Sequence, residues 1–240
     1  MAMREPTHIR AVVAELIGTA FLLTAVVGSG IMGERLAGGN VAVALLANSL
    51  ATGAALVALI LTFGPLSGAH LNPVVSLAQA AQGGISWATA GAYAAAQVAG
   101  ALVGVGTADV MFGEPVFAWS RHVRSGLPQV FSEGVATFGL LVVVVGCARQ
   151  KGSTAAFAVG AYIAGAYWFT SSTSFANPAV TLARSLTDTF AGIRPVDVPM
   201  FVGAQFAGAA VATTMLRWLM PERQTVADAV IGRDLNGSPR

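Results

Sequence analysis

The sequence of 240 residues is 55% hydrophobic and only 10% charged, with a mean hydropathy of +0.70. A water-soluble core cannot bury that much apolar surface, so the composition predicts a membrane protein with several spans. The formal net charge of +2 without a basic run argues against nucleic acid as a partner, and the single cysteine with three scattered histidines predicts neither an internal disulfide nor a metal site.

The first apolar run is Ala11–Met32, and it follows a polar segment of ten residues that includes Arg4 and Arg10. Its 22 residues would reach roughly 33 Å as a helix, which is enough to cross the hydrocarbon core of a bilayer. A cleaved leader would have a shorter apolar region and a small-residue cleavage site. We therefore expect a transmembrane helix here.

Five further apolar runs follow, and the connections over residues 33–40 and 149–154 are short. They are Val41–Phe63, Trp87–Val110, Val130–Ala148, Ala155–Phe169 and Val198–Leu219. The connection over residues 111–129 is longer, and we expect it to cap one face. The sequence thus predicts six spans followed by a polar tail over residues 220–240.

Basic residues beside the spans predict the orientation. With the N-terminus in the cytoplasm, eight basic residues are cytoplasmic and five are outside. The cytoplasmic set is Arg4, Arg10, Arg149, Lys151, Arg217, Arg223, Arg233 and Arg240, and the outer set is Arg35, Arg121, Arg124, Arg184 and Arg194. Six spans then place both terminal segments, residues 1–10 and 220–240, in the cytoplasm.

Two short segments between spans are near copies of each other. Ser67–Ala78 lies between the second and third spans, and Ser174–Ala183 lies between the fifth and sixth. Both contain Asn-Pro, at Asn72 and Asn177, which are 105 positions apart. The residue before a proline avoids helical geometry, whereas proline suits the first turn of a helix. Each copy therefore predicts a short helix that begins abruptly at its asparagine.

The repeat extends through both halves of the chain. The aligned pairs are Glu15 with Glu133, Thr19 with Thr137, Gly28 with Gly146, and Gln97 with Gln205. Each half has three spans and one short helix, and because three is odd the halves cross the membrane in opposite directions. We expect a single channel domain over residues 11–219, with halves 11–110 and 130–219 joined by the 111–129 loop. The two re-entrant half-helices are expected to enter the membrane from opposite faces.

This arrangement predicts a pore. Irregular backbone at membrane depth is tolerated only where protein buries it or a watery cavity lies beside it. Two helix N-termini, each with about half a positive charge, would surround one passage and repel cations. The amides of Asn72 and Asn177 would give a solute oxygen hydrogen-bond donors in place of water. The alternative is that both asparagines serve only as N-caps.

Glu15 and Glu133 allow two interpretations. An acid inside an apolar span is costly and suggests a function such as a proton relay. The alternative, which we favour, is that each carboxylate accepts hydrogen bonds from the backbone of the nearest re-entrant segment and so braces it. The two acids occupy matched positions, and no further acid extends a relay chain.

Over Ala11–Leu219 the chain resembles the aquaporin and aquaglyceroporin (major intrinsic protein) family, through Ser67–Pro73, Asn177-Pro178-Ala179, the paired glutamates and the duplicated glycines. The resemblance implies a homotetramer whose protomers each hold a passive pore for water or small uncharged solutes, with no enzymatic activity and no cofactor. Half-helix dipoles or an arginine are known to exclude protons and cations in such pores. The implied pore centre is His70, Asn72, Pro73, Val74, Asn177, Pro178 and Ala179.

The departures from the family pattern bear on the substrate. The family usually has an arginine three residues after the second asparagine, where this chain has Val180. Counting along the motifs without gaps places the other outer-filter positions at Thr52, Gly165 and Ser174, none of which is aromatic. Val74 stands where the first motif usually has alanine. The set predicts an unusually wide outer constriction with few donors.

Arg184 lies seven residues after Asn177, on the same helix face as Val180 and about one turn further out. One hypothesis is that it reaches the outer vestibule and partly restores the lost positive charge. The alternative is an interfacial arginine that faces lipid headgroups or a loop carbonyl.

A wide filter favours small polyols, urea-like molecules and neutral metalloid acids, while water still passes. Ser174–Val180 and Asp188–Gly192 also resemble the bacterial branch associated with arsenic-resistance operons, which implies arsenite-type solutes and a bacterial inner membrane. Three alternatives stay open: an ordinary water and glycerol channel with no metalloid role, an ion-coupled secondary transporter, and a non-conducting scaffold.

Overall fold

The structure, a computed structural model, describes residues 8–148 and 154–220. The first seven residues, the basic residues Arg149 and Lys151, and the tail from residue 221 lie outside the described residues, and so do the orientation arguments that depend on them. The described α-helices are α1 (His8–Leu36), α2 (Val41–Ser67), α3 (Pro73–Ala81), α4 (Trp87–Phe112), α5 (Leu127–Ala148), α6 (Thr154–Phe169), α7 (Pro178–Ala183) and α8 (Val198–Leu219), with 3-10 turns at Arg184–Leu186 and Pro195–Asp197.

The predicted all-helical membrane fold is confirmed. Five of the described helices, α1, α2, α4, α5 and α8, are long and apolar enough to cross a membrane. The sixth predicted span corresponds to α6, which is apolar but has only 16 residues. The largest difference from the predicted bounds is at α1, which continues past Met32 to Leu36.

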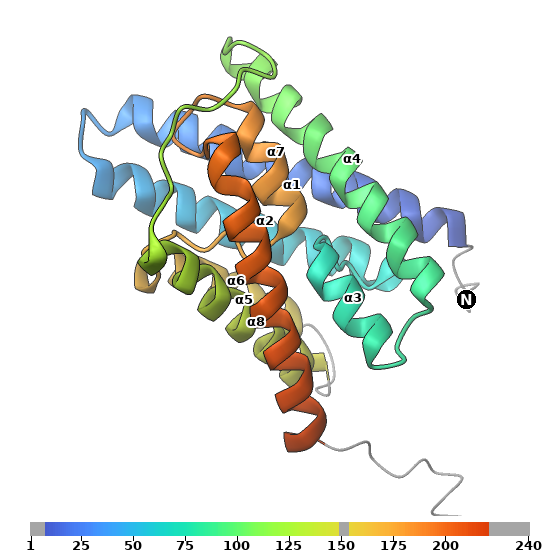
Figure 1. Cartoon of the computed structure of the whole chain (residues 1–240). Helices are drawn as coiled ribbons and strands as arrows, with labels where there is room; N and C mark the ends of the chain where they lie inside the picture. The colour runs from blue at the N-terminus through green and yellow to red at the C-terminus, as the bar shows by residue number, and fades with distance from the viewer. Residues whose placement is uncertain (1–7, 149–153, 221–240) are drawn as a thin grey trace, which may run out of the picture.

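The two halves of the chain pack in the same way (Figure 1). In the first half α1 lies against α2 and α4, and in the second half α5 lies against α6 and α8. The short α3 contacts α4 of its own half and α8 of the other, whereas α7 contacts α8 and α4. The three-plus-three repeat read from the sequence is therefore present, and it brings the two half-helices together between the halves.

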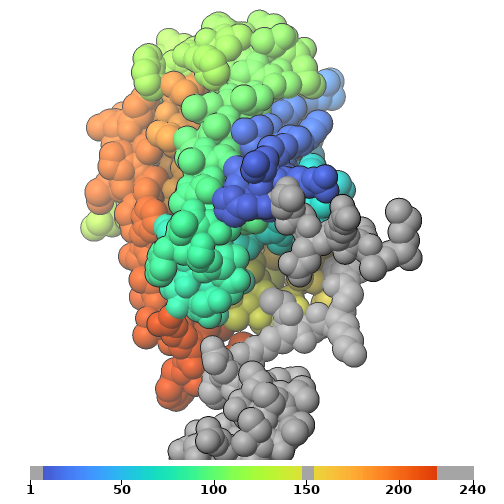
Figure 2. Space-filling view, turned by 90° about the vertical axis from the view of Figure 1, so that its right-hand side faces the viewer, coloured from blue at the N-terminus to red at the C-terminus, as the bar shows by residue number. Residues whose placement is uncertain are grey.

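Small residues permit the closest helix contacts. A Cβ atom at Gly100 or Gly104 of α4 would stand 2.2 Å from a backbone oxygen of α1, so no larger residue fits without separating the helices. Gly208 of α8 has the same relation to α5, where the nearest backbone oxygen would be at 2.3 Å. Such contacts between small residues are typical of helices packed in a membrane. Figure 2 shows α4 on one face of the molecule, between α1 and α8.

The segment between α4 and α5 folds over one end of the helices (Figure 1). Its backbone is tied to the segment that follows α7, because Ser120 N donates to Ser185 O at 2.9 Å and Arg194 N donates to His122 O at 2.9 Å. Arg121 forms an ion pair with Asp188 at 2.7 Å. These contacts fix the segment over the residues that follow the second half-helix.

Candidate functional site

Asn72 and Asn177 each begin a half-helix in the same conformation. Both have extended backbones, with φ of −159° and −157°, and proline follows each at the first helical position. Asn72 Oδ1 accepts from Val74 N at 3.1 Å, and Asn177 Oδ1 accepts from Ala179 N at 3.0 Å. Both side chains are therefore N-caps, which satisfy backbone donors that the helix itself leaves unpaired.

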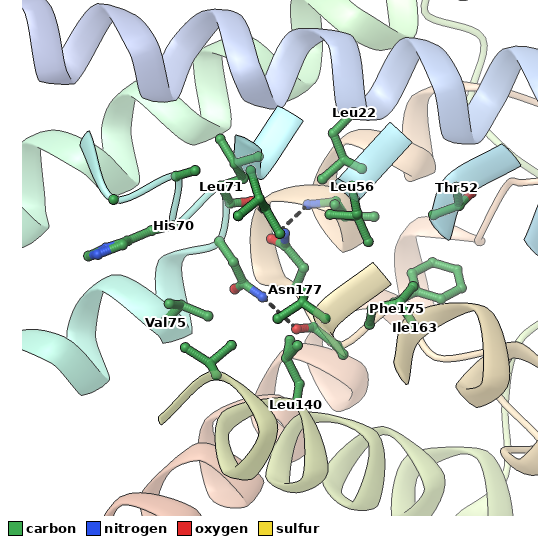
Figure 3. Close-up of a pocket in the computed structure, with 18 of the residues that line it drawn as sticks. Leu22, Thr52, Leu56, His70, Leu71, Val75, Leu140, Ile163, Phe175 and Asn177 are labelled. Atoms are coloured by element: carbon green, nitrogen blue, oxygen red, sulfur yellow. Dashed lines mark hydrogen bonds between the residues drawn. The ribbon is translucent and has the colours of Figure 1, made fainter. Parts of the chain in front are cut away.

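The same two side chains also join the halves of the chain. Asn72 Nδ2 donates to Ala176 O at 2.8 Å, and Asn177 Nδ2 donates to Leu71 O at 2.8 Å (Figure 3). An amide nitrogen has two N–H donors, so one donor of each asparagine remains for other partners. Capping and pore lining are thus compatible in one side chain, whereas the sequence presented them as alternatives.

A buried carboxylate holds the irregular segment that leads into each half-helix. Glu15, on α1, is fully buried and accepts four hydrogen bonds. The donors are Ser67 Oγ (2.6 Å), His70 N (2.9 Å), Leu71 N (2.6 Å) and Gln97 Nε2 (2.8 Å). Glu133, on α5, accepts from Phe175 N (2.9 Å), Ala176 N (2.9 Å) and Gln205 Nε2 (2.7 Å). These are the backbone contacts expected of a brace.

These carboxylates act on strained backbone. Ala69, Leu71, Ser174 and Ala176 have φ between 47° and 51°, a left-handed region that costs a residue with a Cβ on the order of 1 kcal/mol. The positive φ values turn two successive backbone N–H groups of each segment toward one carboxylate. These groups are His70 and Leu71 toward Glu15, and Phe175 and Ala176 toward Glu133. Sequence reasoning did not identify this feature, because alanine and leucine carry no signal for positive φ.

A cavity of about 380 Å³ runs past both asparagines and is lined by residues of both halves. Figure 3 shows His70 near one end, Asn177 in the middle and Thr52 near the other end. Of the residues predicted for the pore, those that line the cavity are Thr52, His70, Asn72, Ser174, Asn177, Val180 and Arg184. Apolar side chains that were not predicted, including Leu22, Leu56, Leu140 and Ile163, make up much of the wall.

Several predicted pore residues do not line this cavity. Val74 and Ala179 are buried in the first turns of α3 and α7, and neither they nor Pro73 and Pro178 reach the cavity wall. Their contribution is to the helix starts, because proline at the first position is preset for helical geometry. Within the tripeptides Asn72-Pro73-Val74 and Asn177-Pro178-Ala179, the asparagine is the residue that lines the cavity.

Gly165 also lies away from the cavity, on an exposed face of α6. Tyr167 of α6 lines the cavity instead, and its hydroxyl lies 3.2 Å from Thr52 Oγ1. Residues that are two positions apart on a helix point about 200° away from each other around its axis. A count that is wrong by two residues therefore selects Gly165, which faces outward, in place of Tyr167, which faces the cavity. The cavity wall therefore has an aromatic residue that the sequence count missed.

Arg184 is buried, with 2% of its surface exposed, and it lines the cavity. Its Nε atom donates to Ala191 O, and its guanidinium carbon lies 3.4 Å from the centre of the Phe175 ring. The side chain thus lines the cavity and also bonds a loop carbonyl, so it combines one feature of each sequence hypothesis. Its place in an outer vestibule stays a prediction.

Arg124, from the segment between α4 and α5, packs beside the same ring, 5.0 Å from its centre. Its guanidinium donates to Gly192 O at 2.7 Å, Thr173 Oγ1 at 3.2 Å, and Ser172 O and Phe190 O at 3.3 Å. Burial lowers the pKa of Arg124 to about 10, so it remains charged at neutral pH. No pattern in the sequence distinguishes it from the other arginines that were predicted to lie outside.

Known proteins resemble this chain in sequence and in fold. The sequence model of the major intrinsic protein family matches residues 2–164 and residues 127–236. An aquaglyceroporin, AqpS, from Rhizobium meliloti (strain 1021) is 51% identical over 218 residues, which cover 91% of this chain and 93% of that protein. Aquaporin NIP1-3 from Oryza sativa subsp. japonica is 34% identical over 73% of this chain, although the match spans only 63% of the rice protein.

A solved structure supports the fold. The X-ray structure of the aquaglyceroporin from Plasmodium falciparum superposes with a TM-score of 0.72, covering 90% of this chain and 98% of that one at 20% sequence identity. At that identity the likeness concerns the fold alone.

Proposed function

The chain belongs to the major intrinsic protein family, and we propose that it is a passive transmembrane channel for small uncharged solutes, namely glycerol-like polyols, neutral metalloid acids such as arsenite, and water. The observation that carries the proposal is the cavity of about 380 Å³ that runs past Asn72 and Asn177 and is walled by both halves of the repeat. Its wall is largely apolar, so a solute meets hydrogen-bond partners mainly at a few polar positions.

The centre of the cavity favours uncharged solutes. Both half-helices begin there, and the positive ends of their dipoles oppose cations. The free N–H of each asparagine offers a donor to a solute oxygen. Glu15 and Glu133 hold the backbone segments that precede the asparagines and so keep these donors in place. An ion would lose its hydration shell in this apolar passage and find too few partners to replace it.

The small side chain of Val180 beside the cavity supports permeation of solutes larger than water. Val180 lines the cavity, and so does the matched residue of the first half, Val75. A short apolar side chain in place of the family arginine leaves width and removes a charge. The similarity of residues 174–180 and 188–192 to the branch associated with arsenic resistance motivates the metalloid assignment, and a homotetramer in a bacterial inner membrane completes the proposal.

The proposal is tested by parallel flux measurements in proteoliposomes that contain the full chain. Stopped-flow light scattering would give water and glycerol permeabilities, and sealed vesicles loaded with arsenite would give metalloid efflux. We expect all three solutes to pass without saturation and without dependence on an ion gradient. A channel that passes water and excludes glycerol would contradict the wide filter, whereas saturable, ion-dependent flux would indicate a secondary transporter.

Val180→Arg is the variant that addresses the filter directly. It places the family's usual charge and bulk beside the cavity, so we expect glycerol and arsenite permeability to fall more than water permeability. If arsenite does not pass the wild-type protein while glycerol does, the protein is an ordinary water and glycerol channel.

A further inference from the structure

We propose that Arg184 is the selectivity-determining residue of the outer mouth, where its guanidinium binds neutral solutes that carry two oxygen atoms on adjacent atoms or on one central atom, such as vicinal diols and trihydroxy acids. The proposal rests on the proposed channel function and names the solute chemistry that this end of the channel prefers. It moves the polar part of the outer filter from position 180, where the family has it, to position 184.

The position of Arg184 along the repeat directs it to the cavity. It lies seven residues after Asn177, and the matched residue of the first half, Gln79, lies seven residues after Asn72. Seven residues are close to two full helical turns, so both side chains return to the face of their asparagine. Gln79 and Arg184 both line the cavity, which shows that this register faces the passage in each half.

The guanidinium of Arg184 is held in place but is not saturated with partners. Its Nε atom is bonded to Ala191 O, and the stack on Phe175 fixes the plane of the group. In the described part of the chain neither Nη1 nor Nη2 of Arg184 has a hydrogen-bond partner, and neither is among the fully enclosed nitrogens. A buried guanidinium with two open donors beside a cavity is a site for an acceptor.

Arg124 provides the contrast that gives this observation its meaning. Both arginines are buried and both pack on Phe175. The nitrogens of Arg124 are all directed to carbonyl or hydroxyl oxygens, and Arg124 does not line the cavity. Arg124 therefore stabilises the loops around this end of the cavity, whereas the guanidinium of Arg184 remains available to a solute in the cavity.

The planar fork of the guanidinium suggests the chemistry of the solute. Two N–H donors on one side of arginine match two acceptor oxygens a short distance apart. Among residues 8–148 and 154–220 the ion pairs engage Arg35, Arg121 and Arg194, so no carboxylate of the described chain occupies Arg184. Thr52 and Tyr167, whose hydroxyls lie 3.2 Å apart, line the same cavity and can complete the polar contacts of such a solute.

The test compares two isomers of equal size, 1,2-propanediol and 1,3-propanediol, whose oxygens are adjacent only in the first. Permeabilities in proteoliposomes are corrected with protein-free vesicles. We expect the wild-type protein to favour the 1,2 isomer at least about tenfold, the factor that corresponds to one additional hydrogen bond to a charged group, and Arg184→Gln to reduce the ratio to about one.

Two controls keep the result interpretable. Arg184→Lys retains the charge but loses the fork, so it should lower the isomer ratio even if the glutamine variant fails to fold. Arg35→Gln removes an arginine that is paired with Glu114 at the surface, and the ratio should not change.

An unchanged isomer ratio in a folded Arg184 variant would overturn the proposal while leaving the channel function intact, whereas absence of diol and water flux in the wild-type protein would refute the channel itself. Potassium formate supplied with valinomycin probes the charged alternative. Formate uptake that disappears in the glutamine variant would show that Arg184 serves an anion and not a neutral solute.

Discussion

Replacing Glu15 by glutamine should destabilise the first half-helix strongly, because the carboxylate accepts four hydrogen bonds in a fully buried position. Glutamine keeps one carbonyl oxygen, which can serve two of these donors. Its amide group then faces the other two donors, so two hydrogen bonds are lost. At about 1.5–3 kcal/mol for a bond to a charged group, the loss is about 3–6 kcal/mol.

The matched change at Glu133 should cost less. Glu133 accepts three hydrogen bonds, two of them at Oε2. A glutamine that keeps its carbonyl oxygen at Oε2 loses only the bond from Phe175 N, which corresponds to about 1.5–3 kcal/mol. The expected order of destabilisation is therefore Glu15→Gln, then Glu133→Gln.

The assay is gel filtration of the detergent-solubilised protein after heating steps, which gives folded yield and an apparent unfolding temperature. Glu114→Gln is the control, because its ion pair with Arg35 is partly exposed and such pairs contribute about 0–1 kcal/mol. Normal yield of Glu15→Gln combined with loss of any pH response of transport would refute the brace and favour a proton relay.

Three further predictions concern the packing, the pore centre and the outer cap. Gly100→Val should abolish folded yield, since its Cβ would stand 2.2 Å from α1 backbone, whereas Gly91→Val on the same helix, with nothing within 4 Å, should fold. Asn177→Asp retains the cap oxygen but adds a negative charge where the dipoles oppose cations, so potassium leak into vesicles should rise. Hydrogen bonds and the charge of Arg121 lower the pKa of Asp188. The stability that this pair contributes is therefore fully present above the unfolded pKa of about 3.9 and is lost as the pH falls through the lower folded pKa. Proteolysis of the segment between α4 and α5 should increase only in strong acid, and Asp188→Asn should produce the same increase at neutral pH.

The fold was predictable because the signals are redundant. Six apolar runs, two Asn-Pro segments and matched glutamates each indicate the inverted repeat, and the structure places the matched residues in equivalent contacts. Aligning the two halves of the sequence is enough to match Glu15 with Glu133, for example, and each accepts hydrogen bonds from the backbone segment before a half-helix. Residues whose role follows from the repeat are the ones that sequence reasoning found.

The outer end was predicted less well, because its side chains come from segments outside the repeat or from positions that a simple count misplaces. Tyr167 was missed by two residues on α6. Arg124 comes from the segment between the halves and has no counterpart in the repeat. The positive φ values at Leu71 and Ala176 depend on the tertiary contacts of the glutamates and have no local sequence signal.

The repeat also indicates where selectivity must reside. At the centre the two halves present the same groups, since Asn72 matches Asn177 and Val75 matches Val180, and a symmetric centre cannot distinguish the two ends of the passage. The halves differ at several positions that line the cavity, and two of these lie two residues before each asparagine and seven residues after it.

On one side these positions hold His70, whose ring contacts Tyr93 and Ser76, together with Gln79. On the other side they hold Phe175 and the arginine that stacks on it. Because a guanidinium with open donors binds solute oxygens more strongly than a neutral amide does, the end that carries Arg184 is where solutes are chosen.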